Sequence, residues 1–280
     1  MINIESIKGK IRNISKDKNL SSQEVLQMYF FERFLKRLSI SKYKNNFVIK
    51  GGFLISSIIG IENRTTMDID TTVKGIPLRK EGIKEIVEEI INIEVNDGIK
   101  FKLKGIHYIK EDDEYENFRV SIVAEIGKIK NPMKIDITTG DIITPREIEY
   151  SYKSIFNKEN IKVMAYTLET VIAEKYESII KRNITTTRMR DFYDLYILYN
   201  LKNKEIDYKI LKEAITKTSI RRESLEIIKN YREILEDIKK DPYLLDLWNS
   251  YRKENKYIGN LEFDDVIKSI SDISEKINEI

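Results

Sequence analysis

Two nearby stretches decide the fold: FVIKGGFLISSII at residues 47–59 and MDIDTTV at residues 67–73. The first is a short apolar run that turns at Gly51-Gly52 and continues as a short helix over residues 53–59. The second predicts a strand over residues 68–73. Because side chains alternate along a strand, Asp68 and Asp70 fall on the same face of it. Strands and helices that follow one another in this way favour an α/β domain.

The flanking sequence extends this arrangement in both directions. Ser21-Ser22-Gln23-Glu24 has the form of a capping box and predicts a helix over residues 22–39. An apolar stripe predicts a second helix over residues 79–93, and alternation predicts strands within residues 99–138. From Thr167 onward the patterns are helical. We therefore expect an α/β (α+β) domain with a mixed sheet at residues 1–160 and an all-helical domain at residues 161–280.

Composition narrows the classes of protein that the chain can belong to. Of its 280 residues, 41% are hydrophobic and 34% are charged, a mixture typical of globular proteins. The chain has no cysteine, which excludes thiol chemistry. No apolar run is long enough for a membrane helix and no secretory signal is visible, so we expect a cytoplasmic protein without a membrane partner. A net charge of +3 is too small to indicate nucleic acid by itself. The single histidine, His107, and the single tryptophan, Trp248, are interpreted as structural.

Three polar features in the first domain could carry phosphate chemistry. Gly51-Gly52 at a strand-to-helix turn could bring backbone N–H groups to a phosphate, or could be an ordinary turn. Asp68 and Asp70 supply the hard oxygen ligands that Mg²⁺ prefers, although a solvated strand face is the simpler alternative. Asp136, in a second apolar strand, could join them in a two-metal site for in-line phosphoryl transfer. It could equally form a salt bridge on an edge strand.

Two predicted helices of the second domain also carry charges on apolar faces. Lys175 falls within the apolar stripe of its helix, so it must meet an anion or extend its ammonium group into solvent. In the next helix, Arg188, Asp191 and Asp194 are spaced three apart among apolar and aromatic residues. They could belong to a phosphate-binding network or form an internal ion pair between Arg188 and one of the aspartates.

Together, these stretches resemble the AbiEii/AbiGii nucleotidyltransferase toxins of type IV toxin–antitoxin and abortive-infection systems. The resemblance extends from about residue 5 to residue 275 and rests on the order and spacing of its motifs. They are KGGFL at 50–54, RTTMDID at 64–70, KIDITTGD at 134–141, TLETVIAEK at 167–175, RMRDFYDL at 188–195 and WNSY at 248–251.

The resemblance implies a nucleotidyltransferase fold, an NTP donor and Mg²⁺ or Mn²⁺ as cofactor. It implies a bacterial, antiviral-defence role, with the 3′ end of tRNA as acceptor in some members and an antitoxin encoded nearby that need not contact the toxin. We expect a catalytic group formed by Asp68, Asp70, Lys175 and Asp191, and a metal site formed by Asp68, Asp70 and Asp136. We expect nucleotide and phosphate contacts from Lys50, Gly51, Gly52, Arg64, Thr66 and Arg188, with supporting roles for Asp141 and Asp194. The helical domain would contribute its lysine and aspartate to the active-site cleft.

One departure from the family pattern keeps alternatives open. Family members often place a threonine after the glycines, where this chain has Phe53, so the backbone, Ser56 or Ser57 would have to replace the missing phosphate-binding hydroxyl. The leading hypothesis is transfer of a nucleotide from NTP to an RNA or protein acceptor. A second is transfer to a small molecule, such as an antibiotic hydroxyl. A third is a nucleotide- or RNA-binding module whose site has lost catalysis.

Overall fold

The computed structural model describes residues 4–77, 79–109 and 117–280. Its chain divides into two units, one formed by residues 1–141 and 148–165, the other by residues 142–147 and 166–280. The first unit carries the sheet and the second is helical, as the sequence predicts for an α/β domain followed by a helical domain.

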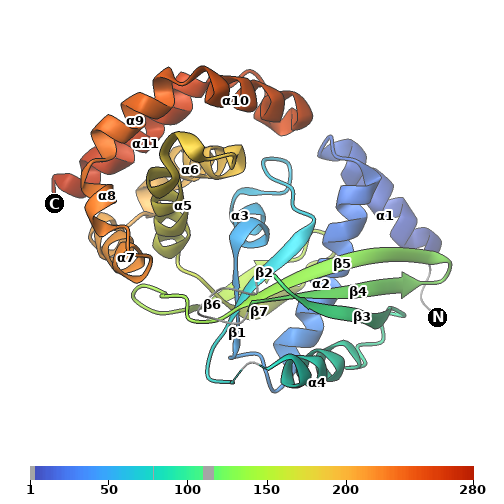
Figure 1. The fold of residues 1–280 in the computed structure, drawn as a ribbon. Helices are drawn as coiled ribbons and strands as arrows, with labels where there is room; N and C mark the ends of the chain where they lie inside the picture. Colours follow the sequence, from blue (N-terminus) through green and yellow to red (C-terminus); the bar gives the residue numbers. More distant parts are fainter. Residues whose placement is uncertain (1–3, 78, 110–116) are drawn as a thin grey trace. The chain divides into compact units, whose positions relative to one another are not determined.

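A seven-stranded mixed sheet organises the first unit (Figure 1). Two strand pairs are parallel, β1 with β7 and β2 with β5, and the others are antiparallel. In the order in which they pair, the strands are β3 (Lys100–Tyr108), β4 (Phe118–Ile126), β5 (Ile129–Thr138), β2 (Asp68–Val73), β1 (Phe47–Lys50), β7 (Asn160–Ala165) and β6 (Ile148–Lys153).

The two faces of the sheet differ sharply in polarity. Ile69, Val120 and Ile135 are fully buried on one face. Helix α2 (Ser22–Ile40) packs on this apolar face, where the Phe34 ring meets the Phe101 ring of β3 edge to face at 6.5 Å. The residues between these apolar positions lie on the opposite face because side chains alternate along a strand. That second face carries the charged residues of the candidate site.

The local predictions for this unit are largely confirmed. Ser21 caps α2 through the predicted capping box with Glu24. β2 spans residues 68–73 as expected, and α4 (Lys80–Ile91) falls within the predicted helix 79–93. Helix α3 (Gly51–Ile59) begins at the glycine pair, two residues before the prediction.

Three elements of the first unit are absent from the sequence prediction: α1 (Ile4–Asp17), β6 and β7. Strand β6 and the loop that follows it are joined to α2 by a buried carboxylate. Glu32, which has no exposed surface, accepts hydrogen bonds from Tyr152 Oη at 3.0 Å, Ser154 Oγ at 2.6 Å and the Ile155 N–H at 2.8 Å. Such long-range contacts are invisible in local sequence patterns.

The second unit consists of helices, with α7 to α11 forming an arc outside α5 and α6 (Figure 1). Trp248 is fully buried and packs on Phe263 at 5.6 Å, which confirms its predicted core position. The helices are α5 (Leu168–Arg182), α6 (Met189–Lys202), α7 (Tyr208–Arg221), α8 (Leu225–Lys229), α9 (Tyr231–Lys240), α10 (Pro242–Glu254) and α11 (Phe263–Asn278).

Residues 142–147 belong to the helical unit although they precede β6 in the chain. The Thr144 N–H donates to Thr170 Oγ1 at 2.9 Å, and Thr167 Oγ1 donates to the Thr144 carbonyl at 2.7 Å. Thr167 is also the N-cap of α5. These bonds tie the segment to the first turn of α5.

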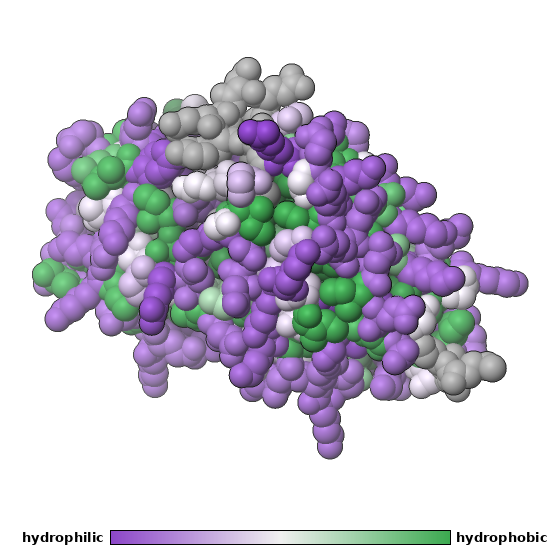
Figure 2. Space-filling view, turned by 90° about the horizontal axis from the view of Figure 1, so that it is seen from below, coloured by the Kyte–Doolittle hydropathy of each residue, from purple (hydrophilic) through white to green (hydrophobic). Residues whose placement is uncertain are grey.

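The surface is mainly polar. On the face seen in Figure 2, hydrophilic residues dominate and hydrophobic residues form scattered patches. Within the described residues, none of the helices combines the length and the hydropathy that a membrane crossing requires.

Candidate active site

The site is built around the start of α3. Gly51 adopts a φ of +62°, a conformation that side chains with a Cβ rarely take. A Cβ at this position would lie 2.6 Å from Asp70 Cγ and 2.8 Å from Asp70 Cβ. The neighbouring Gly52 N–H points at Asp70 Oδ2 across 3.4 Å, at the long end of hydrogen bonding. The glycine pair therefore permits the first turn of α3 to approach the Asp70 carboxylate.

Four charged residues that are register partners on neighbouring strands form a row across the sheet. Lys50 of β1 is the register partner of Asp70 of β2, Asp70 is the partner of Asp136 of β5, and Asp136 is the partner of Arg119 of β4. Directly opposed residues of neighbouring strands share a face of the sheet. The four side chains thus form one line across the sheet with the charges plus, minus, minus, plus.

The two ends of this row are held by ion pairs. Arg119 donates from Nε to Asp136 Oδ1 at 2.8 Å and from Nη2 to Asp136 Oδ2 at 2.7 Å. Lys50 Nζ lies 2.6 Å from Asp141 Oδ2. The alternative in which Asp136 forms a salt bridge is therefore realised, although β5 lies inside the sheet and not at its edge. Arg119 was not singled out by the sequence, where its only signal is the alternation of FRVSI at residues 118–122.

Asp141 lies in a network of donors beside the row. It accepts hydrogen bonds from Thr138 Oγ1 at 2.6 Å and from Thr72 Oγ1, in addition to the Lys50 ion pair. Burial alone would raise the pKa of Asp141, but Lys50 and the hydroxyl donors outweigh it and lower the pKa to about 2. Asp141 is therefore ionised at neutral pH and fixes the Lys50 ammonium.

Asp70 is the carboxylate of the site whose surroundings disfavour its charged form. Burial, followed by the nearby Asp68 and Asp136 carboxylates, raises the pKa of Asp70 to about 6, against the opposing effects of Lys50 and the Gly52 N–H. The Asp68 carboxylate accepts a hydrogen bond from a neighbouring hydroxyl: Thr66 Oγ1 donates to Asp68 Oδ1 at 2.7 Å. Asp68 and Asp70 thus lie together on one strand face, as predicted.

Asp136, the third predicted metal ligand, has no oxygen free for a metal ion. Both oxygens of Asp136 are engaged by Arg119. Over residues 4–77, 79–109 and 117–280, no group of three or more histidine, cysteine, aspartate or glutamate side chains is arranged to hold a metal ion. Asp70 and Asp136 are therefore directly opposite each other on neighbouring strands, as a shared metal site requires. Asp136, however, is bound to Arg119.

Arg64 and Thr66 lie beneath the glycine pair. A Cβ on Gly52 would come within 2.8 Å of Arg64 Nη2 and 3.1 Å of Thr66 Oγ1. Arg64 is 1% exposed, and its Nη1 donates to the Thr65 carbonyl. In this conformation Arg64 therefore braces the turn from inside the unit.

The serines expected to replace the missing hydroxyl do not both suit that role. Phe53 is buried and stacks on Tyr152 at 5.4 Å, so the aromatic ring is a core residue. Ser56 has no exposed surface, which makes the expectation for Ser56 wrong: helix α3 turns it into the core. Ser57 is half-buried; its hydroxyl donates to the Leu54 carbonyl at 2.7 Å and lies 3.1 Å from Tyr150 Oη. The backbone N–H groups of the α3 turn are the remaining candidates.

Within the helical unit, the four predicted residues of α5 and α6 and the position before α6 lie together in one cluster. Lys175 Nζ of α5 lies 2.7 Å from Asp191 Oδ1 and 2.8 Å from Asp194 Oδ2 of α6. Arg188 Nε lies 2.9 Å from Asp191 Oδ2, so the predicted internal ion pair is present. Asp194 is fully buried and the Lys175 side chain is only 12% exposed, so Lys175 meets anions and does not extend into solvent. Burial alone would lower the pKa of Lys175, but the two aspartates raise it above its ordinary value.

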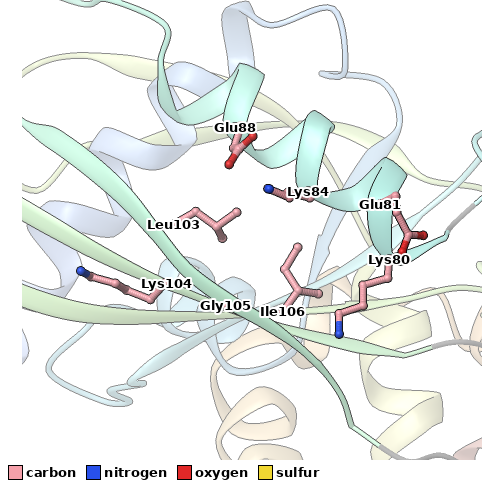
Figure 3. Close-up of a pocket in the computed structure, with 8 residues that line it drawn as sticks. All are labelled: Lys80, Glu81, Lys84, Glu88, Leu103, Lys104, Gly105 and Ile106. Atoms are coloured by element: carbon pink, nitrogen blue, oxygen red, sulfur yellow. The ribbon is translucent and has the colours of Figure 1, made fainter.

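A groove lies between α4 and β3, and its lining does not include the predicted site residues (Figure 3). It encloses about 500 Å³ and is lined by Lys80, Glu81, Lys84 and Glu88 of α4 and by residues 103–106 of β3. His107 follows on β3 and is exposed opposite Arg119.

Comparison with known proteins identifies the family of the chain. A model of the family described as nucleotidyl transferase AbiEii toxin, type IV TA system, matches residues 33–269. The chain belongs to the AbiEii nucleotidyltransferase toxin family. This AbiEii-family protein is accordingly a nucleotidyltransferase, and membership of a type IV toxin–antitoxin family implies a nucleotide substrate and an antitoxin partner.

Solved structures place the AbiEii-family protein in the same fold. A Helicobacter pylori protein described as a nucleotidyltransferase aligns with a TM-score of 0.53 at 18% identity, covering 93% of this chain and 98% of that one. The JHP933 protein of Helicobacter pylori aligns with a TM-score of 0.51 at 18% identity, covering 93% and 95%. At this identity the likeness concerns the fold alone. Among curated proteins, none matches the chain significantly.

Proposed function

We propose that this AbiEii-family enzyme transfers a nucleotide from NTP to an RNA acceptor, the 3′ end of tRNA, and acts as the toxin of a bacterial defence system against phage. The observation that carries this proposal is the Asp68–Asp70 pair on one strand face, with Asp70 held against the first turn of α3. In a family that transfers nucleotides, such a pair provides the carboxylate oxygens that a divalent cation needs.

A magnesium or manganese ion fits the chemistry of this donor set. Burial, followed by the nearby Asp68 and Asp136 carboxylates, raises the pKa of Asp70, so a divalent cation would relieve an excess of negative charge. Asp68 and Asp70 would hold the ion, and Asp136 would join them on leaving Arg119. When bound, the ion supplies charge neutralisation at the transferring phosphoryl group.

The chain's own residues would bind and orient the reactants. The N–H groups at the start of α3 would receive phosphate oxygens at the positive end of the helix dipole. Lys50, fixed by Asp141, and Arg64 would add positive charge beside them. The acceptor hydroxyl attacks the α-phosphorus, the bond to the β-phosphate oxygen breaks, and pyrophosphate leaves while the hydroxyl proton passes to an ionised carboxylate or water.

We assign Lys175, Asp191 and Arg188 to the same reaction, with Asp194 in a supporting role. The support is that these residues are joined to one another by ion pairs within the helical unit. A buried lysine held by two aspartates is expensive to desolvate, and such perturbed clusters are concentrated at functional sites. In the proposed reaction the Lys175 ammonium neutralises phosphate charge.

The test is incubation of the purified protein with each α-³²P-labelled NTP, Mg²⁺ and total RNA. The matched control is Asp68→Ala, which removes one proposed ligand. Label transferred to tRNA by the wild type but not by Asp68→Ala is the expected result. Label in the protein itself or in an added antibiotic would replace the RNA acceptor with another one. Nucleotide binding without any transfer would indicate a module that has lost catalysis and would contradict the proposal.

A further inference from the structure

The Arg119–Asp136 pair has features that a simple surface salt bridge lacks. Both guanidinium contacts are short, 2.8 Å and 2.7 Å, and each engages a different oxygen of Asp136. Parallel, bidentate contacts of this kind are the strongest that an arginine makes with a carboxylate. They occupy the same two oxygens through which Asp136 could reach a cation.

The pair is also asymmetric in its exposure to solvent. The Asp136 side chain is 14% exposed, whereas that of Arg119 is 42% exposed. Asp136 is therefore fixed in the sheet, while Arg119 reaches it from the solvent side. An exposed side chain with several rotatable bonds can leave at much lower cost than a buried strand residue can move.

Neighbouring charges act on Arg119 from the same face. The pKa of Arg119 is raised first by its hydrogen bonds and charge interaction with Asp136, and further by Asp68 and Asp70. Asp70 is directly opposite Asp136 on the neighbouring strand. The guanidinium therefore offsets, together with Lys50 on the other side of Asp70, the repulsion between these carboxylates when the protein holds no metal.

We propose that Arg119 is a positioning residue that serves as the resident counter-ion of Asp136 and competes with the divalent cation for it. This inference rests on the proposed function. In the nucleotide-free protein, Arg119 holds both oxygens of Asp136. A divalent cation binding at Asp68 and Asp70 recruits Asp136 only by displacing the guanidinium, so Arg119 sets the metal concentration at which the three carboxylates act together.

The competition predicts a gain of metal affinity when the arginine is removed. Arg119→Gln eliminates the competing charge and one of the two parallel contacts, and should tighten Mn²⁺ binding by about tenfold. Arg119→Lys keeps the charge without the bidentate geometry and should lie between the two. Adding Asp136→Asn to Arg119→Gln should abolish the gain, because the released carboxylate is no longer available.

The experiment is calorimetric titration of Mn²⁺ into nucleotide-free protein, with electron paramagnetic resonance counting the bound ions. The variants are Arg119→Gln, Arg119→Lys, Arg119→Gln/Asp136→Asn and Asp68→Ala. Lys102→Gln is the matched control for loss of one positive charge, since Lys102 forms an exposed ion pair with Glu125 on the adjoining strands. Circular dichroism and the unfolding temperature verify that each variant is folded.

The outcomes separate this inference from the proposed function. Tighter Mn²⁺ binding in Arg119→Gln, unchanged binding in Lys102→Gln and loss of the gain in the double variant support it. If Asp68→Ala loses Mn²⁺ while Arg119→Gln binds it as weakly as the wild type or more weakly, the competition is refuted and the metal site stands. If neither the wild type nor Arg119→Gln binds Mn²⁺, both the competition and the proposed metal chemistry are refuted.

Discussion

Gly51 leaves room for the carboxylate of Asp70 that no other residue type would leave: a Cβ on Gly51 would lie 2.6 Å from Asp70 Cγ. The two residues are 19 positions apart along the chain and meet because Lys50 and Asp70 are register partners on β1 and β2. The same position needs a φ of +62°. Backbone conformation and close approach therefore impose the glycine independently of each other.

Gly51→Ala should displace Asp70 and abolish nucleotidyl transfer. The methyl group and the positive φ together should also cost about 1–3 kcal/mol of stability. Transfer activity and the unfolding temperature are the measurements. The matched control is Gly82→Ala in α4, where a Cβ meets no atom within 4 Å and the helix should gain about 0.5–1 kcal/mol. An active Gly51→Ala enzyme would show that this close approach is dispensable.

Asp70 should make metal-free stability fall as the pH rises. Its pKa of about 6 in the folded protein exceeds that of an ordinary aspartate, so its stabilising effect is complete below pH 4 and is lost as the pH passes 6. Asp70→Asn should therefore be more stable than the wild type at pH 7.5 by about 1–3 kcal/mol, with no such advantage at pH 4. Urea unfolding at both pH values without metal tests this. Mg²⁺ should stabilise only the wild type, and an equal effect on both proteins would remove Asp70 from the metal site.

Asp141 should show the opposite dependence on pH. Its pKa of about 2 lies below the ordinary value, so its contribution to stability is present above pH 4 and is lost as the pH falls through 2. Asp141→Asn should cost about 1–3 kcal/mol at pH 7, because Lys50 loses the Asp141 carboxylate, and about half as much at pH 3. The measurement is the free energy of unfolding at each pH. A penalty that does not change with pH would point to lost hydrogen bonds and not to charge.

Lys175→Met should fold but lose nearly all transfer activity, with a drop of about 100-fold or more. Its removal leaves the buried Asp194 without the ammonium group 2.8 Å away, which should cost about 3 kcal/mol. Adding Asp194→Asn should restore most of the stability and none of the activity. Added NTP should raise the unfolding temperature of the wild type more than that of the variant.

A surface lysine provides the control for that experiment. Lys217→Met removes an exposed partner of Glu213 on α7 and should change stability by less than about 0.5 kcal/mol. Full activity in a folded Lys175→Met protein would return Lys175 to a purely structural role.

Expression of the wild-type protein should slow the growth of its host, and Asp68→Ala should relieve the effect. The reason is that Asp68 and Asp70 are the proposed ligands of the catalytic ion. Growth curves at matched protein levels, measured by immunoblotting, provide the readout. Undiminished toxicity of folded Asp68→Ala would separate growth arrest from nucleotidyl transfer.

The features that the sequence predicted well are encoded over short distances. The capping box of α2 and the alternation of Asp68 and Asp70 depend on neighbours within four residues. Strand β6 and the loop after it instead contact the buried Glu32 in α2, more than 100 positions away, and no local pattern revealed that contact. Arg119 was missed for the same reason: alternation gives its face, but only the register of β4 and β5 gives its partner.

The inclusion of residues 142–147 in the helical unit has a consequence for how this protein can be divided. The backbone enters the helical unit at residue 142, returns to the sheet at residue 148 and leaves again after residue 165. A single cut therefore cannot release either unit whole: cleavage after residue 165 strips the helices of the segment that Thr167 and Thr170 hold. Neither unit is encoded by one continuous stretch of sequence. A recombination event that exchanges one unit between relatives must therefore join the sequences at three junctions, or else exchange both units together.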